Sequence, residues 1–284
     1  MEKSVIDIIC EEYDSFFDSE KKIAGYIINH YDKVVEMTVS DLARESGASE
    51  ASVSRFCRRI GMKGFHQLKI SLARGMVEND SGKIKTVSNR ISVEDYSQSL
   101  QNILANKTEE IRQTISNMDN EDLPKILEII KNARLVQFTA AGNTIPVIID
   151  GAYKFNQIGI HAITSEIWET QIASVFNLTK EDVIIAVSNS GESRNVITAL
   201  EIAKEKGVPS IAITNSPLSG AARLADHHIT TTTREKIFLD GYCFSRVSAT
   251  TVIEVLYLFL TSMMKKNAYK TIARHENSIS FSKS

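Results

Sequence analysis

The hydrophobic pattern of this chain changes its period once, across a polar segment at Glu78–Ser99. Before that segment, regular stretches have apolar residues at helical spacing. After it, such stretches alternate with short β-branched runs. Alternating strands and helices build a parallel sheet covered by helices, whereas helical spacing alone builds a bundle. We therefore predict an all-helical head over residues 1–77, a linker and the start of a connecting helix over 78–105, an α/β domain over 106–265, and a C-terminal tail over 266–284.

The composition excludes several classes of protein. The net charge is only −2, so any contact with nucleic acid must come from a local basic patch. The cysteines Cys10, Cys57 and Cys243 are odd in number and far apart, which argues against a disulfide framework or a zinc site. No signal peptide is apparent, and the apolar stretch Val252–Leu260 contains Glu254 and is too short for a membrane span. We expect a cytoplasmic protein with no metal, no cofactor and no membrane partner.

The head contains the pattern of two short helices joined by a tight turn. A preceding amphipathic helix is predicted by apolar residues at helical spacing, which are Ile23, Tyr26, Ile27 and Tyr31. Thr38 and Asp41 form a capping box for a second helix, and Gly47 ends it because glycine adopts a left-handed turn without steric cost. Ser49 can cap a third helix, which ends at Gly61. This arrangement predicts a helix-turn-helix.

The third helix is predicted to meet DNA. Between Ala51 and Val77 there are six basic residues and no acidic ones, which is the charge pattern expected at a phosphate backbone. Cys57 lies on the apolar face and is interpreted as a small core residue. The predicted DNA-contacting residues are Ser49, Ser52, Ser54, Arg55, Arg58, Arg59 and Lys63. The alternative is a helical protein-interaction domain with a solvated basic face.

The second part of the chain repeats a strand–loop–helix pattern. The strand candidates are Leu135–Thr139, Ile160–Thr164, Asp182–Val187, Ser210–Thr214 and Ile229–Thr232, and a long helix from Phe244 to about Met264 closes the domain. The run at Asp182–Val187 is continuously apolar, as in a central strand buried on both faces. We predict a doubly wound, parallel, five-stranded sheet, in which ligands bind beyond the carboxyl ends of the strands.

Two loops at those carboxyl ends have the composition of an anion site. Ser188–Ser193 holds three hydroxyls and Gly191 between a strand and a helix, where backbone amides and the helix N-terminus favour a phosphate. Asn143 and Thr144 follow another buried strand and could hold the rest of the ligand. The loops match neither a nucleotide P-loop nor a dinucleotide fingerprint. Alternatively, the serine-rich loop only caps a helix.

The order of these motifs resembles a known family. The head sequence MTVSDLARESGASEASVSRFCRRIGMKGFHQLK, a linker and a sheet domain containing SNSGES together resemble the RpiR family of bacterial transcription regulators. The sheet domain resembles the sugar-isomerase (SIS) domain, whose marker S-x-S-G-x-[ST] is matched by Ser188, Ser190, Gly191 and Ser193. The resemblance extends over nearly the whole chain, from Val5 to Lys265.

The resemblance implies a regulator that binds operator DNA and whose SIS domain binds a phosphorylated sugar, assembled as a homodimer or homotetramer. The implied phosphosugar-binding residues are Asn143, Thr144, Ser188, Ser190, Gly191, Glu192 and Ser193. The family's first loop usually reads G-x-G-x-S, whereas here Ala140 replaces the first glycine and Thr144 the serine.

Two other functions remain open from the sequence. Some SIS domains are aldose–ketose isomerases, in which a carboxylate or histidine moves a proton. Here the candidates would be Glu192, His161, His227 and His228. Glu192 at a helix start is more simply explained as a complement to the helix dipole, so we expect no catalysis. The second alternative is a sugar-phosphate-responsive protein-interaction module without DNA binding.

Overall fold

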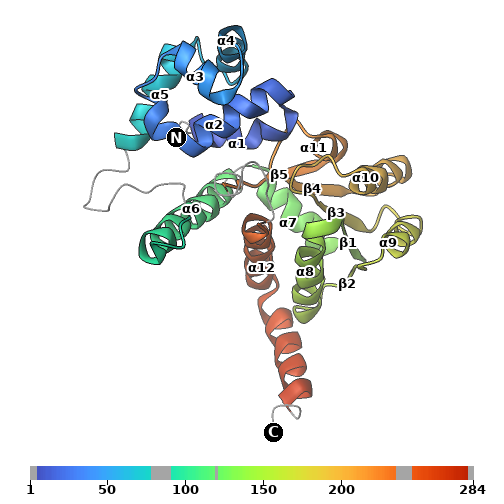
Figure 1. The fold of residues 1–284 in the computed structure, drawn as a ribbon. Coiled ribbons are helices and arrows are strands. Elements are labelled where there is room, and N and C mark those ends of the chain that lie inside the picture. The colour runs from blue at the N-terminus through green and yellow to red at the C-terminus, as the bar shows by residue number, and fades with distance from the viewer. Residues whose placement is uncertain (1–4, 78–90, 119–120, 235–244, 281–284) are drawn as a thin grey trace. The chain divides into compact units, whose positions relative to one another are not determined.

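The computed structural model describes residues 5–77, 91–118, 121–234 and 245–280. The chain divides into two compact units, Met1–Glu110 with Thr232–Ser245 and Ile111–Thr231 with Arg246–Ser284. Figure 1 shows the elements of both units. Residues 78–90, most of the predicted linker, lie outside the described residues, and the helix α6 (Tyr96–Asn117) follows them.

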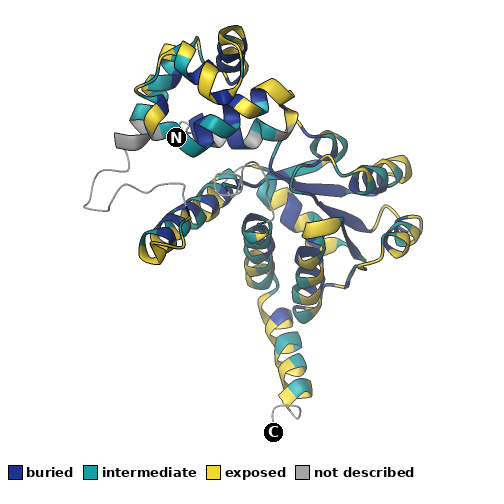
Figure 2. Cartoon of the chain, viewed as in Figure 1, coloured by how far each residue is buried: buried dark blue, intermediate teal, exposed yellow. Residues whose placement is uncertain are grey.

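The described part of the head is helical. Its helices are α1 (Val5–Glu12), α2 (Asp18–Val34), α3 (Val39–Ser46), α4 (Glu50–Arg59) and α5 (Phe65–Val77), with a 3-10 turn at Tyr13–Ser15. Their apolar faces meet in one core, coloured dark blue in Figure 2, which includes Ile9, Ile23, Ile27, Leu42, Phe56 and Leu68. We did not predict α1, because its eight residues make only about two turns of helix.

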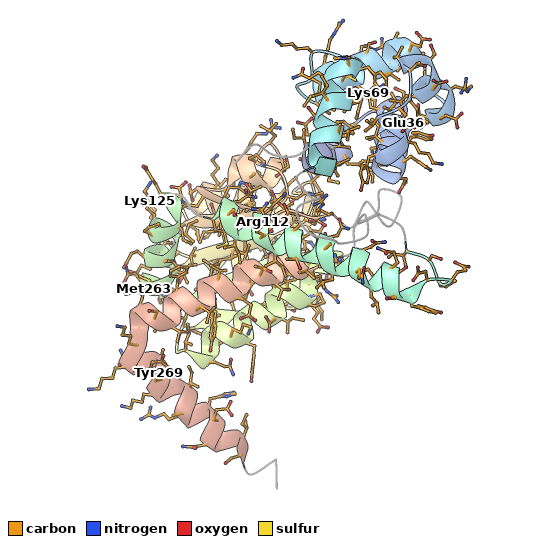
Figure 3. The ribbon with its side chains drawn as sticks, turned by 90° about the vertical axis from the view of Figure 1, so that its left-hand side faces the viewer. Glu36, Lys69, Arg112, Lys125, Met263 and Tyr269 are labelled. Carbon is orange, nitrogen blue, oxygen red and sulfur yellow. The ribbon has the colours of Figure 1, made fainter. Side chains whose placement is uncertain are left out.

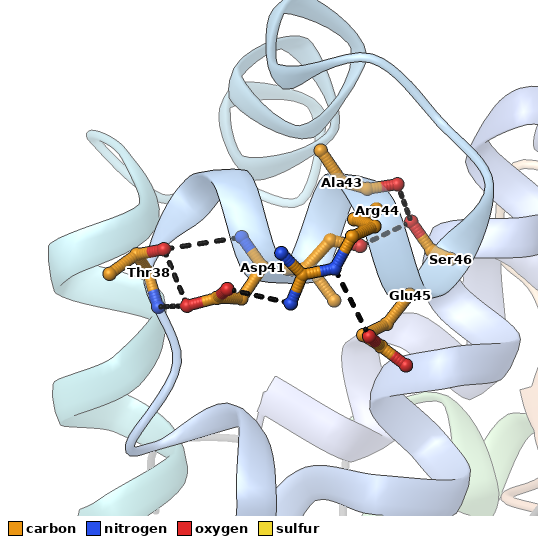
Figure 4. A network of polar contacts seen from close by, with 7 residues as sticks. Thr38, Asp41, Ala43, Arg44, Glu45 and Ser46 are labelled. Carbon is orange, nitrogen blue, oxygen red and sulfur yellow. Dashed lines mark hydrogen bonds and ion pairs between the residues drawn. The ribbon is translucent and has the colours of Figure 1, made fainter.

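The ends of α3 and α4 confirm the predicted caps. Thr38 Oγ1 accepts the N–H of Asp41 at 3.2 Å, and the Asp41 carboxylate accepts the N–H of Thr38 at 3.1 Å (Figure 4). Gly47 has a φ of 65°, the left-handed conformation that ends α3. Ser49 Oγ accepts the N–H of Ser52 at the start of α4. The tight turn between these two short helices is therefore built by the residues that the pattern indicated.

The second unit contains a parallel sheet. Its strands are β1 (Val136–Ala140), β2 (Ala162–Ile163), β3 (Val183–Val187), β4 (Ser210–Thr214) and β5 (His227–Thr230), in the order β2-β1-β3-β4-β5. All neighbouring strands pair in parallel, which confirms the predicted five-stranded sheet. Two edge strands differ from the prediction: β2 is only two residues long, and β5 begins at His227.

Helices cover both faces of the sheet (Figure 1). The first layer contains α7 (Asp122–Asn132), α8 (Ile145–Gln157) and α12 (Val247–Ser280), and the second contains α9 (Trp168–Val175), α10 (Arg194–Lys206) and α11 (Gly220–Leu224). Alternate residues of β3 enter the two cores: Ile185 packs with the first layer, and Ile184 and Ala186 pack with the second. Every residue of β3 is buried as a result, which accounts for its continuous apolar run.

The closing helix is longer than predicted. α12 runs to Ser280 and bends at Lys265, whose φ is 28°, so Met263 and Tyr269 lie on either side of the bend (Figure 3). By length and composition alone, α12 could cross a membrane. Its residues Val252, Ile253, Leu256 and Leu260 are nevertheless buried in the core of the sheet domain. One face of α12, from Val252 to Leu260, therefore belongs to the core of this domain.

Candidate functional site

The outward face of α4 presents a short basic surface. Arg55 and Arg58 are exposed on this helix, Ser54 on the same helix is half-buried, and Lys63 is exposed in the turn that follows. The backbone N–H of Lys63 donates to Gln67 Oε1 at 2.6 Å, which fixes that turn in front of α5. The guanidinium of Arg55 contacts Ser52 Oγ at 3.2 Å. These basic groups have the position and charge needed to contact a DNA backbone.

Two of the predicted DNA-contacting residues have partners within the head instead: Ser52 is buried, and Arg59 is bound to α2 and the turn before it. Ser52 is only 8% exposed, and its hydroxyl lies 2.9 Å from that of Ser49. Arg59 donates to Glu20 Oε2 at 2.6 Å and to the backbone carbonyl of Ser15 at 2.6 Å. Its guanidinium also lies over the ring of Phe16, 5.2 Å from the centroid. Helical spacing placed both residues close to the surface, but it did not reveal that α2 supplies a partner for Arg59.

The basic stretch therefore offers fewer free cations than its sequence suggests. Lys69, labelled in Figure 3, donates from Nζ to the carbonyl of Met37 at 2.9 Å and lies over the ring of Phe65. Like Arg59, it contributes to the packing of the head. Arg55, Arg58 and Lys63 are the basic side chains of the described α4 and its following turn that remain directed to solvent.

The loop after β3 turns at Gly191. Its φ is 71°, and its N–H donates to Ser188 Oγ at 3.1 Å. A Cβ at this position would overlap Ser219 Oγ and Cβ and would lie 3.2 Å from Thr214 Cγ2. Glycine is therefore required here both by the backbone conformation and by the lack of space. Because Ser188 Oγ serves as an acceptor in this turn, its own proton can be donated to a ligand.

The loop ends at the N-terminus of α10, a helix of 13 residues. Ser193 is its N-cap residue, but its hydroxyl makes no capping hydrogen bond. Ser190 Oγ accepts the N–H of Glu192 at 3.3 Å and, like Ser188, keeps its proton for donation. Three hydroxyl donors thus gather next to the first-turn amides of a helix, whose dipole favours an anion. This is the arrangement that a phosphate group needs.

Glu192 fastens this loop to the loop after β4. Its Oε1 accepts the N–H of Gly220 at 2.8 Å, at the start of α11, and the carbonyl of Gly191 accepts the N–H of Ala221 at 2.9 Å. The carboxylate therefore complements the N-terminus of α11, whereas we had expected it to complement its own helix. The prediction that Glu192 contacts a phosphosugar is not supported by this geometry, because its carboxylate is bound to the backbone and would repel an anion.

The loop after β1 is held by Thr144. This side chain is 6% exposed, and its hydroxyl lies 3.0 Å from the carbonyl of Val187 and 3.1 Å from that of Ala141. Its proton is therefore used within the fold, so Thr144 aligns the loop and has no donor left for a phosphate. Ala140 lies in β1, outside the left-handed region, so the missing glycine costs no backbone strain. Asn143 is exposed at the same edge of the sheet.

Two of the three candidate catalytic histidines lie away from the loops at the carboxyl ends of the strands, whereas His228 contacts Thr214 at the end of β4. His161 directly precedes β2, and His227 begins β5, so both are at the amino ends of strands. His228 Nε2 lies 2.9 Å from Thr214 Oγ1, and burial lowers the pKa of His228 to about 4. Among the described residues, no three His, Cys, Asp or Glu side chains gather as a metal site would require.

The sequence reading missed the loop after β4. Ser219 caps α11 and lies against Gly191, while Thr214 Oγ1 donates to the carbonyl of Ser216 at 2.9 Å. The segment Asn215–Ser216–Pro217 follows β4 and is not among the predicted site residues. Its position was the signal that could have identified it. The segment follows a buried strand at the carboxyl edge of the sheet, as the loops after β1 and β3 do.

Comparisons with known proteins match both units. The helix-turn-helix domain of the rpiR family matches residues 3–79, and the SIS domain matches residues 129–259. An HTH-type transcriptional regulator from Caldanaerobacter subterraneus is 32% identical over 271 residues, which cover 95% of this chain and 94% of that protein.

Solved structures share the same fold. The sugar isomerase domain of an RpiR transcription factor from Sphaerobacter thermophilus is 26% identical, with a TM-score of 0.59, and covers 64% of this chain and 99% of its own. The Vibrio vulnificus NanR protein complexed with ManNAc-6P is 22% identical, with a TM-score of 0.58 and 97% coverage of both chains. A helix-turn-helix head joined to a SIS domain defines a class of transcription regulators. This chain belongs to the RpiR family of that class.

Proposed function

We propose that operator binding by this regulator is modulated by a phosphorylated sugar bound at the carboxyl edge of the SIS sheet. The observation that carries the proposal is the group of three hydroxyls at the N-terminus of α10. Ser188, Ser190 and Ser193 retain donors, and Gly191 provides the turn that brings them together. ManNAc-6P in the NanR complex is a phosphorylated sugar, the ligand class that such a site suits.

The sugar end of the ligand would lie toward the loop after β1. Asn143 is exposed there and carries both a donor and an acceptor, which suits sugar hydroxyls. Thr144 holds that loop against β3 through the carbonyl of Val187. Glu192 holds the phosphate loop against the loop after β4. The ligand would therefore meet a site whose walls are already joined by hydrogen bonds, which lowers the cost of ordering them.

In the head, DNA would be contacted by the outward face of α4. Arg55 and Arg58 would reach phosphates or base edges, and Lys63 would reach the adjoining phosphates. Ser49 and Ser54 lie on or beside the same helix and offer hydroxyls. The chain would act as a homodimer or homotetramer in the cytoplasm, because regulators of this kind present two heads to paired half-sites.

We propose further that this chain senses the sugar without converting it. An isomerase needs a carboxylate or histidine free to move a proton beside the sugar. Glu192 is bound to the amide of Gly220, and His228 Nε2 is hydrogen-bonded to the Thr214 hydroxyl. Effector binding and operator binding are then linked, with a coupling free energy of about 1–3 kcal/mol for regulators of this kind.

A ligand screen tests the effector site. The chain is titrated by calorimetry with inorganic phosphate, fructose 6-phosphate, glucose 6-phosphate, N-acetylmannosamine 6-phosphate and arabinose 5-phosphate. Every sugar phosphate that binds is then incubated with the chain in an isomerase assay. Ser190→Ala should abolish sugar-phosphate binding and leave operator affinity unchanged. Ser174→Ala on α9, whose hydroxyl donates to the Thr170 carbonyl, is the control and should change neither. Normal binding by Ser190→Ala would remove this site, and turnover would favour the enzyme.

An operator-binding experiment tests the head. Genomic fragments that the chain retains are identified first, and their affinity is then measured with single variants. Arg55→Ala and Arg58→Ala should each weaken binding at least severalfold, because each removes a positive charge from the face directed to DNA. Lys22→Ala removes the same charge from an exposed position on α2 and serves as the control. Unchanged affinity in both arginine variants would favour the protein-interaction module.

A further inference from the structure

The edge strand β2 stops short of its neighbour β1. The two strands pair over two residues only, and the N–H of Val136 donates to the carbonyl of His161 at 2.9 Å. A parallel ladder advances by the same number of residues on both strands. Four residues further on, from 136 to 140 and from 161 to 165, a continued ladder would join the N–H of Ala140 to the carbonyl of Ser165.

The side-chain amide of Gln171 lies between those two groups. Its Oε1 accepts the N–H of Ala140 at 3.1 Å, and its Nε2 donates to the carbonyl of Ser165 at 2.8 Å. Gln171 comes from α9 and is 2% exposed. The ladder bond is thus carried through one carboxamide, and the two backbone segments are separated by its width. We call this arrangement the Gln171 wedge.

The wedge is held by two further hydrogen bonds. Thr139 Oγ1 donates to the same Oε1 at 2.6 Å, and Gln137 Nε2 donates to the backbone carbonyl of Gln171 at 2.8 Å. Thr139 and Gln137 are no more than 1% exposed. Buried polar groups are expensive to leave unpaired, so a carboxamide bonded at both ends has little freedom to move.

We propose that Gln171 is a positioning residue that opens the sheet edge beside the loop after β1 and thereby makes room for the sugar end of the effector. This inference rests on the proposed function. The wedge acts on Ala140, which directly precedes the loop containing Gly142, Asn143 and Thr144. The phosphate loop follows β3, on the other side of β1, and the hydrogen bonds of the wedge go to Gln137, Thr139, Ala140 and Ser165. Phosphate anchoring and sugar accommodation therefore depend on different residues.

The test compares sugar phosphates with inorganic phosphate. Gln171→Leu removes both ends of the bridge at similar size, and Gln171→Glu keeps the acceptor for Ala140 but turns an oxygen toward the carbonyl of Ser165. Thr139→Val is a milder variant that removes only the hydroxyl aligning the carboxamide. Each variant that is folded by circular dichroism is titrated with inorganic phosphate and the four sugar phosphates named above. Gln157→Leu on α8, where the amide contacts the Tyr153 hydroxyl, is the control.

We expect the best-binding sugar phosphate to lose about tenfold in affinity, the equivalent of one hydrogen bond, while inorganic phosphate binds within about twofold of the wild-type chain. The control should match the wild type for both ligands. Unchanged sugar-phosphate affinity in the Gln171 or Thr139 variants would overturn the proposal. Equal losses for both ligands would also overturn it, because they would indicate only a general structural role.

Amide hydrogen exchange separates this inference from the proposed function. In the ligand-free chain, the Ala140 amide should exchange faster in Gln171→Leu than in the wild type, whereas the Gly191 amide should be unchanged. If no sugar phosphate binds the wild-type chain, the proposed function fails, and exchange alone decides whether the wedge holds the loop. Unchanged exchange at Ala140 would then overturn the wedge.

Discussion

Replacing Gly191 with alanine should damage the SIS domain through one added methyl group. The residue has a φ of 71°, where a side chain costs about 1–2 kcal/mol. The added Cβ would also overlap Ser219 and lie 3.2 Å from Thr214 Cγ2, and forced overpacking of this kind costs about 1–3 kcal/mol. We therefore expect Gly191→Ala to lower the free energy of unfolding of the SIS domain by about 2–5 kcal/mol.

Gly207 provides a matched control at the other end of α10. It has a similar φ of 68°, but the atom nearest to an added Cβ is Lys180 Cε, at 3.2 Å, in a flexible side chain. Gly207→Ala should thus cost only the backbone term, about 1–2 kcal/mol. The single tryptophan of the chain, Trp168, lies on α9 and reports urea unfolding of this domain by fluorescence.

The two variants should also differ in ligand binding. Relief of the overlap at Gly191 requires movement of Ser219 or of the loop itself, so Gly191→Ala should lose sugar-phosphate binding at concentrations that saturate the wild type. Gly207→Ala should retain it. If the two variants had equal unfolding free energies and both bound the effector, the close approach between the loops after β3 and β4 would be refuted.

Other predictions concern single side chains with defined partners. Arg59→Ala should destabilise the head by about 1–2 kcal/mol, because it removes the contacts with α2. Arg58→Ala should leave the stability of the head unchanged. Urea unfolding followed by amide exchange in α4 measures both variants. The pKa of His228 is lowered by burial from 6.5 to about 4, so the unfolded chain takes up its proton first as the pH falls. The free energy of unfolding of the SIS domain is therefore highest above pH 6.5. It falls by about 2 kcal/mol toward pH 4, after allowance for the partial exposure of His228. His228→Asn should flatten this part of the pH profile of tryptophan-detected unfolding, and His161→Asn should not. Burial raises the pKa of the Cys57 thiol to about 11, so iodoacetamide at pH 8 should label it only after unfolding, as read by peptide mass spectrometry.

Much of the fold was predictable because its signals are local. The buried strand β3 is a continuous apolar run, and the caps at Thr38, Ser49 and Gly47 identify themselves by residue type. The predicted strand bounds were wrong at the two edge strands of the sheet, β2 and β5. The carboxamide of Gln171 takes the place of the next ladder bond after β2, and no periodicity in the sequence reveals a side chain that substitutes for a strand.

The site was predictable as a region but less so as individual residues. A serine-rich turn after a buried strand identified the loop containing Ser188 and Ser190. The loop is recognised by its serines and glycine, and the strand before it by its continuous apolar run. The roles of Glu192, Thr144 and Arg59 were set by partners far away in the sequence or by a neighbouring strand. Such contacts appear only when the tertiary structure places the partner, so residue type and spacing could not supply them.

The two binding sites should respond differently to salt, because they attract anions by different means. In the proposed phosphate site, the hydroxyls and helix amides of Ser188–Ser193 would hold the ligand. The one charged side chain of this loop, Glu192, is bound to Gly220, and the exposed Arg194 follows the loop. The DNA face instead presents three exposed cations in each head, Arg55, Arg58 and Lys63. Two heads on one operator would neutralise about six phosphates, which gives a slope of about −5 for log K against log[salt].

Effector affinity should change with a slope no steeper than about −1, since at most one cation per site takes part. The measurement compares operator and sugar-phosphate affinities across sodium chloride concentrations from about 50 to 200 mM. In this range the Debye screening length is about 10 Å. A flat operator profile would refute the role of the basic face. An effector slope as steep as that of the operator would show that cations, and not the hydroxyls of Ser188–Ser193, hold the phosphate.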